Sequence, residues 1–163
     1  NRSGIISNAG PIGGVRQQGK WKINARYNKS SLIKRFERIA EYRHRIHVSN
    51  KDGIEFISEL DNHNLFFFID PPYYEKGPEL YLNSLDHDYH ERLSKSLRQM
   101  NRAAWVLTYD DCDAIRCMYQ GWAEIRPFSL RYSAAKRRMG NEVMITPKGL
   151  SLPYTQSSLA VSW

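Results

Sequence analysis

The chain has 163 residues, enough for one domain with a sizeable core rather than two. It carries 24 Lys and Arg against 17 Asp and Glu, a formal net charge of +7, which favours a polyanionic partner such as nucleic acid but specifies no chemistry. Two isolated cysteines argue against a zinc site or a disulfide scaffold, and the lack of a long apolar run argues against a membrane span. We therefore expect a soluble intracellular protein.

The first part of the chain predicts loop followed by one helix. Residues 1–29 are rich in Gly, Asn, Ser and basic residues without periodicity, so they predict loop with at most one short hairpin. The glycine cluster at 10–14 lacks the preceding strand and following helix of a dinucleotide-binding loop. Residues 31–45 repeat apolar side chains every three or four positions, which predicts an amphipathic helix. A short strand is predicted at 46–49.

The rest of the chain alternates predicted helices and strands. After a short helix at 54–60, residues 65–69 are apolar at every position, which predicts a strand buried on both faces. Asp88 and Glu91 have the spacing of a capping box for a helix over 88–100, with Leu93, Leu97 and Met100 inward. The predicted elements that follow are a strand at 103–108, a helix at 110–120 and strands at 122–132 and 142–146. This alternation predicts a mostly parallel α/β sheet.

The predicted strand at 65–69 leads directly into Asp70-Pro71-Pro72-Tyr73. Ligand sites of open α/β sheets lie at the carboxyl ends of the strands, so this position suits a site. The exocyclic amino group of adenine is a poor nucleophile because its lone pair is delocalised into the ring. Two acceptors beside it, the Asp70 carboxylate and the Pro71 carbonyl, could bind its hydrogens and free that lone pair. The prolines stiffen the turn, and Tyr73 offers a face for stacking on an extruded base.

In these residues the chain resembles the D12, Dam-like class of adenine-N6 DNA methyltransferases. Asp70-Pro71-Pro72-Tyr73 resembles the catalytic signature of that family. The strings at 74–77, 80–81, 105–110, 132–134 and 142–145, together with Arg138, resemble its later motifs in the family order, and those at 1–4 and 26–29 resemble its DNA-recognition region. The resemblance extends over nearly the whole chain to about residue 146.

The resemblance implies an α/β fold, namely a partial Rossmann-like methyltransferase sheet with helices on both faces and an N-terminal DNA-recognition segment. It implies S-adenosylmethionine as methyl donor without a metal, duplex DNA as partner, and direct transfer to N6 of a flipped adenine in a bacterial or phage-infected cytoplasm. The expected segments are 1–45 for DNA recognition, 46–146 for catalysis and 147–163 as a tail. By resemblance Asp52 and Gly53, together with Asp70, would contact the donor, although an ordinary strand-to-helix turn explains Asp52 and Gly53 equally well.

Basic residues supply the candidate DNA contacts. One group comprises Lys20, Lys22, Arg26, Lys29, Lys34 and Arg35, and another comprises Arg131, Lys136, Arg137 and Arg138. Such residues neutralise phosphates without reading bases, whereas Asn28 could bond an adenine edge. The predicted DNA-binding residues are Arg2, Arg26, Asn28, Lys29, Arg137 and Arg138. His87 and His90 have no metal-binding companions in the sequence, so we expect capping or surface roles for them.

The chain departs from the family in one large respect. The Gly-rich donor-binding strand and the lysine-containing motif that precede the recognition region are not in the sequence, so we expect weak donor binding unless an upstream segment or a second chain completes the sheet. A non-catalytic DNA-binding remnant therefore remains an alternative. Methylation of an amide or an RNA amine is a third reading, but those enzymes more often begin the four-residue motif with Asn, and Asp70 counts against it.

Overall fold

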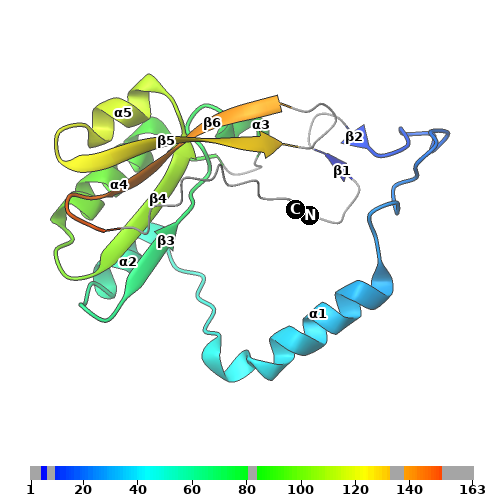
Figure 1. Ribbon diagram of the computed structural model, residues 1–163, viewed down its shortest axis with the longest axis horizontal. Helices are drawn as coiled ribbons and strands as arrows, with labels where there is room; N and C mark the ends of the chain where they lie inside the picture. Colours follow the sequence, from blue (N-terminus) through cyan, green and yellow to red (C-terminus); the bar gives the residue numbers. More distant parts are fainter. Residues whose placement is uncertain (1–4, 7–9, 81–83, 133–137, 152–163) are drawn as a thin grey trace. The chain divides into compact units, whose positions relative to one another are not determined.

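The computed structural model describes residues 5–6, 10–80, 84–132 and 138–151, and statements about structure refer to these residues. The chain divides into two compact units, Asn1–Lys51 and Asp52–Trp163. The α-helices and β-strands of both units are labelled in Figure 1. Within the described residues, no helix combines the length and the apolar character that crossing a membrane requires.

The first unit contains one short hairpin and one long exposed helix. Strand β1 (Ile5–Ile6) pairs antiparallel with β2 (Gly10–Pro11), as the predicted hairpin allowed. Helix α1 (Lys29–Glu41) begins where the Asn28 side chain accepts a 2.9 Å hydrogen bond from the Ser31 amide, and a 3-10 turn, η2 (Arg43–Arg45), follows it. No residue of α1 is buried. The helix predicted at 31–45 is confirmed, with its last turn tightened.

The strand predicted at residues 46–49 is wrong. These residues form no regular secondary structure, and both Ile46 and Val48 are exposed. β-branched residues favour a strand through the packing of their side chains on a half-buried sheet surface, and this segment has no such surface. Asp52 and Gly53 therefore follow an irregular segment rather than a strand.

The second unit is a four-stranded mixed sheet with helices, an α/β architecture. Its strands are β3 (Phe66–Ile69), β4 (Ala104–Asp110), β5 (Ala123–Tyr132) and β6 (Arg138–Pro147), in the order β3-β4-β6-β5. Its helices are α2 (Gly53–Glu59), α3 (Gly77–Leu80), α4 (His87–Gln99) and α5 (Asp113–Tyr119). The predicted strands of this unit are confirmed. The sheet is not mostly parallel, because only β3 and β4 pair in parallel, and β6 runs antiparallel to both of its neighbours.

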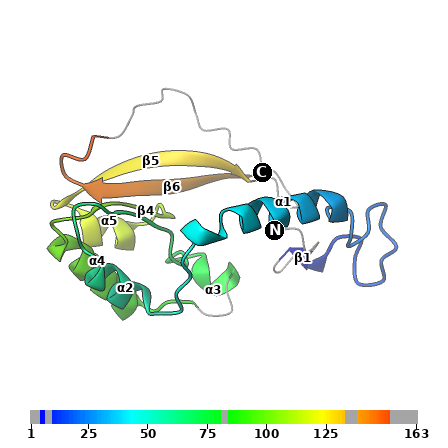
Figure 2. The same cartoon turned by 90° about the horizontal axis from the view of Figure 1, so that it is seen from below.

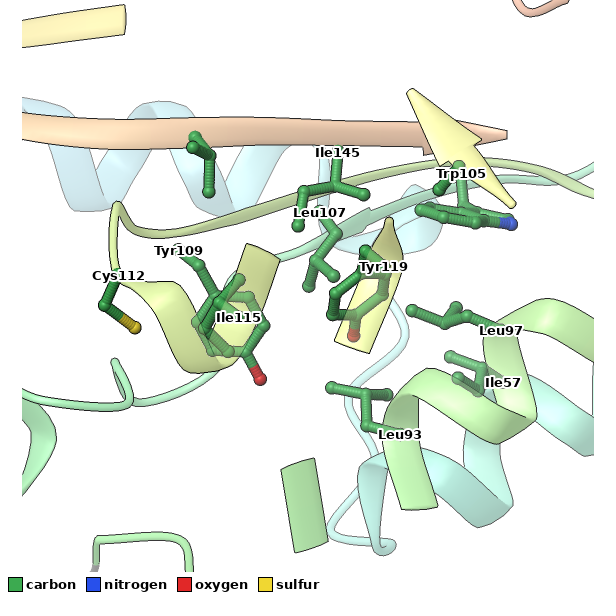
Figure 3. Close-up of a cluster of buried hydrophobic side chains, with 12 residues drawn as sticks. Ile57, Leu93, Leu97, Trp105, Leu107, Tyr109, Cys112, Ile115, Tyr119 and Ile145 are labelled. Atoms are coloured by element: carbon green, nitrogen blue, oxygen red, sulfur yellow. The ribbon is translucent and has the colours of Figure 1, made fainter. Parts of the chain in front are cut away.

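A cluster of buried hydrophobic residues lies on one face of this sheet, while Val106 is buried on the other face of β4. The alternating residues Trp105, Leu107 and Tyr109 of β4 and Val143 and Ile145 of β6 point into the cluster, and α2, α4 and α5 cover it from the same side (Figure 2). Figure 3 shows how the aromatic and aliphatic side chains of strands and helices meet. The buried members are Ile57, Leu93, Leu97, Trp105, Leu107, Tyr109, Cys112, Ile115, Tyr119, Ala123, Val143 and Ile145. The expectation of helices on both faces is therefore not met by the described helices of this unit.

Strand β3 is covered on one face only, contrary to the prediction of a strand buried on both. Phe67 and Ile69 pack against the core, whereas Phe66 and Phe68 are 56% and 68% exposed. The cause is that β3 stands at the end of the described sheet and its side chains alternate between the two faces. An uninterrupted apolar run therefore does not establish how many faces of a strand are covered.

Carboxylates cap helix α4 and anchor the start of strand β4. Asp86, not Asp88, caps α4 by accepting a 2.8 Å bond from the Tyr89 amide, and Glu91 pairs with Lys95 instead of completing a capping box. Asp61 accepts hydrogen bonds from the amides of residues 101–103 and so anchors the chain at the start of β4. The predicted inward positions Leu93 and Leu97 of α4 are confirmed, and Met100 packs against the core just beyond its end.

Candidate active site

The Asp70-Pro71-Pro72-Tyr73 turn begins at the carboxyl end of β3, beside the parallel strand β4. The Thr108 hydroxyl on β4 donates a 2.7 Å hydrogen bond to Oδ1 of Asp70. This bond joins two residues 38 positions apart and fixes the plane of the carboxylate. No other hydrogen bond to Asp70 comes from the part of the chain that the structure describes, so Oδ2 is left as an acceptor on an exposed side chain.

The backbone after the motif is bound by a second carboxylate, Asp110, at the last position of β4. Its Oδ1 accepts from the Tyr74 amide at 2.9 Å, and its Oδ2 accepts from the amides of Glu75 and Lys76 at 2.9 and 3.3 Å. Asp110 is only 2% exposed. A buried carboxylate that accepts three backbone hydrogen bonds is a strong anchor, because the bonds are charge-assisted. The turn is thus held at its start by Thr108 and at its end by Asp110.

A third carboxyl group, Glu142 on β6, completes the polar cluster. It is directly opposite Asp110 in the antiparallel ladder and is 1% exposed. Burial raises the pKa of Glu142, Asp70 and Asp110 raise it further, and a hydrogen bond from Tyr73 and the charge of Lys76 oppose the rise. The site therefore gathers carboxyl groups from the ends of β3 and β4 and from β6.

The raised pKa of Glu142 predicts a specific pH dependence of stability. Between its ordinary value of 4.5 and the raised folded value, the folded state binds more protons than the unfolded state, so stability falls as the pH rises through that window. Glu142→Gln cannot titrate. We expect it to unfold like the wild type at about pH 4 and to be the more stable of the two at about pH 8, as measured by urea denaturation.

Glu91→Gln is the matched control for this experiment. Glu91 is on the surface, and its hydrogen bond to Lys95 lowers its pKa, so its contribution to stability is present above its ordinary pKa and is lost as the pH falls. Its replacement is expected to be neutral or slightly destabilising at about pH 8, the opposite sign from Glu142→Gln. Equal behaviour of the two variants would contradict the assignment of Glu142 as a buried, destabilised anion.

A cluster of Tyr74, His87, His90 and Tyr109 lies next to the turn. His90 is buried on α4, not at the surface as the sequence suggested, and its Nδ1 lies 2.7 Å from the Tyr109 hydroxyl. Tyr74 packs on the His90 ring with a centroid distance of 5.1 Å, and its hydroxyl lies 2.9 Å from Nδ1 of His87. Burial lowers the pKa of His90, which favours its neutral form. These contacts connect the residue after the motif to the core.

The predicted donor contacts Asp52 and Gly53 lie at the start of α2. Oδ1 of Asp52 accepts from the amides of Ile54 and Glu55, and Oδ2 accepts a 2.9 Å bond from the Tyr89 hydroxyl of α4, which lowers the pKa of Asp52. The carboxylate therefore serves the protein's own structure by capping α2 and linking it to α4. A contact of Asp52 or Gly53 with the donor's adenine ring stays a prediction.

The predicted DNA-binding residues are distributed over both units. Arg26, Asn28 and Lys29 belong to the first unit, where the side-chain oxygen Oδ1 of Asn28 accepts from the Ser31 amide and caps α1. Arg138 is the first residue of β6, while Arg2 and Arg137 lie outside the described residues. An open pocket on α1 has a volume of about 510 Å³ and is lined by Asn28, Ser30, Ser31, Lys34, Arg35 and Arg38. It brings three cationic side chains together on one helix.

Sequence reasoning assigned no role to Thr108, Asp110 or Glu142, although all three lie in strings quoted for the family resemblance. A usable signal for Asp110 was a carboxylate ending an apolar strand next to the motif strand, because neighbouring parallel strands end at the same edge of a sheet. Among the described residues, no group of three or more His, Cys, Asp or Glu side chains could hold a metal ion. Neither the scan of protein-family models nor the search of curated proteins finds a match to this chain.

Proposed function

We propose that the protein acts as an adenine-N6 DNA methyltransferase with a Rossmann-like sheet, in which the second unit supplies the site for the methyl-accepting amine. The observation that carries this proposal is the Asp70 carboxylate, held by Thr108 at the carboxyl ends of two parallel strands and followed by two prolines and a tyrosine. In the proposed reaction the donor would supply the methyl group, so that a bond forms between its methyl carbon and N6 as its carbon–sulfur bond breaks, and N6 would lose one proton to solvent water. The methyl group would come from S-adenosylmethionine.

The residues of the turn would act on the amine in complementary ways. Oδ2 of Asp70 and the Pro71 carbonyl are acceptors for the two hydrogens of the amino group, which localises the nitrogen lone pair. The negative charge of Asp70 stabilises the positive charge that develops on nitrogen during transfer. Tyr73 would stack on the extruded base and replace part of the stacking that the base loses on leaving the duplex. None of these roles requires a covalent enzyme intermediate.

Exposed basic and aromatic side chains of the first unit support duplex DNA as the partner. Helix α1 is exposed along its length and carries Lys34, Arg35 and Arg38 on one surface, while Trp21 and Tyr27 are exposed just before it. Cations of this kind contact phosphates, and binding through them weakens steeply as salt rises. The same feature favours the second candidate function, a DNA-binding protein without catalysis, which would use this unit alone.

Mass spectrometry for N6-methyladenine in duplex DNA incubated with the protein and S-adenosylmethionine distinguishes the two candidates. We expect N6-methyladenine to accumulate with time and enzyme concentration. Salt-sensitive DNA binding without any N6-methyladenine would favour the non-catalytic candidate. Methylation of another amine, such as cytosine N4, would contradict the substrate assignment.

A further inference from the structure

Asp110 and Glu142 form a buried carboxyl pair beneath the motif. They are register partners on β4 and β6, so their side chains leave the same face of the sheet, with Cβ atoms roughly 5 Å apart. Burial disfavours the ionised form of Glu142 and so raises its pKa, and the nearby Asp70 and Asp110 raise it further. An apolar pair would pack here without the cost of burying two carboxyl groups. The hydrogen bonds that the two groups make therefore indicate what they do.

Those contacts converge on the residues that follow Pro72. Asp110 binds the three consecutive amides of Tyr74, Glu75 and Lys76. Glu142 accepts a hydrogen bond from the Tyr73 side chain. Its Oε1 is buried and has no hydrogen-bond partner among the described residues. The charged groups that influence Glu142 most are Asp70, Lys76 and Asp110, so each of them belongs to the turn or supports it.

The two carboxyl groups divide the turn between them. Asp110 binds the backbone amides of residues 74–76. This segment directly follows the motif, so its position determines where the Asp70 side chain and the Pro71 carbonyl lie. Glu142 holds the one aromatic side chain of the motif. We propose that Asp110 and Glu142 are positioning residues, Asp110 for recognition of the adenine amino group and Glu142 for stacking of the Tyr73 ring on the extruded base. The proposal rests on the proposed function, since it concerns the same site.

Two DNA probes separate recognition of the amine from stacking. One is a duplex with adenine opposite an abasic site, where extrusion costs less, and the other is the same duplex with purine, which lacks the amino group, in place of that adenine. The wild type is expected to bind the adenine probe at least about tenfold more tightly, the factor expected of a hydrogen bond to a charged group. Asp70→Ala is expected to bind both equally.

Asp110→Asn tests the backbone role. Its amide group turns a donor toward the three N–H groups, so we expect the preference for adenine over purine to fall by about tenfold while the affinity for the purine probe changes little. Native-state hydrogen exchange supplies a readout that does not involve DNA. The amides of residues 74–76 should be protected in the wild type and lose that protection in Asp110→Asn, while the paired amides of β4 and β6 stay protected.

Glu142→Leu and Glu142→Gln test the ring role as a matched pair. Gln keeps an acceptor for the Tyr73 hydroxyl and Leu does not, so Leu is expected to weaken both probes by a similar factor, roughly fivefold to tenfold, while Gln retains most of the affinity. Tyr73→Phe removes the same hydrogen bond from its other end and leaves Glu142 in place. It should reproduce the effect of Leu even if Glu142→Leu does not fold.

The outcomes separate this inference from the proposed function. A wild type that does not distinguish adenine from purine contradicts the proposed function. A wild type that does distinguish them, with Asp110→Asn preserving both the preference and the protection of residues 74–76, overturns the role of Asp110. Full affinity in both Glu142→Leu and Tyr73→Phe overturns the role of Glu142.

Discussion

Asp70→Ala is expected to abolish methyl transfer while leaving DNA binding largely intact. The carboxylate supplies both the acceptor for the amino group and the charge that stabilises the developing cation, so its removal should lower kcat roughly 10²- to 10⁴-fold. Affinity for duplex DNA should change little, because phosphate contacts by Lys and Arg dominate it. The measurements are initial rates of N6-methyladenine formation by mass spectrometry and the Kd for duplex DNA at fixed salt.

Thr108→Val is the graded control for this prediction. Valine has nearly the shape of threonine but cannot donate to Oδ1 of Asp70, so the carboxylate remains while its orientation is released. We expect a loss in kcat of about tenfold, between the wild type and Asp70→Ala. An alanine variant with near-normal turnover would remove Asp70 from the mechanism, and a parallel loss of DNA affinity would indicate a general folding defect instead.

The elements that periodicity predicted well are those whose side chains face a single core. Helix α4 shows this: Leu93 and Leu97 are spaced by one helical turn, and both are buried. The predicted strand around Trp105 and Leu107 is also confirmed as β4. In both elements the local pattern and the tertiary environment agree, so the sequence alone is sufficient.

The failures occurred where tertiary surroundings decide the outcome. The apolar run at 65–69 could not reveal that Phe66 and Phe68 would face away from the helices, because that depends on which face the helices cover. The segment at 46–49 has strand-forming residues, but none of the described strands pairs with it. Local composition carries no information on either point.

The sequence predicted the motif residues of the candidate site but not the residues that hold the motif in place. Asp70 and Tyr73 stand in a recognisable motif, whereas Thr108, Asp110 and Glu142 reach that motif only through strand pairing. Asp52 shows the converse. Its place before a helix suggested a donor contact by resemblance and a turn by chemistry, and the structure assigns its carboxylate the capping and bridging bonds.

Leu107→Ala is expected to be among the most destabilising single substitutions in the second unit. Leu107 is 0% exposed at the centre of β4, between Ile69 of β3 and Ile145 of β6. Truncation removes buried methyl groups and leaves a cavity that close neighbours cannot fill, at a cost of about 2–5 kcal/mol. Urea denaturation followed by the fluorescence of the buried Trp105 would report it as a lower midpoint with an unchanged m-value.

Phe68→Ala is the matched comparison for Leu107→Ala, because it tests whether the exposed face of β3 contributes to stability. Phe68 lies one residue before the end of the neighbouring strand β3 and is larger than Leu107, yet 68% of it is exposed. Because Phe68 is exposed, although its register partner Val106 on the same face is buried, its truncation should shift stability by no more than about 0.5 kcal/mol. A cost approaching that of Leu107→Ala would mean that the second face of β3 is also covered in solution. The prolines of the motif would then follow a strand packed on both faces, and the Asp70 turn would start from a more rigid base than Thr108 and Asp110 alone provide.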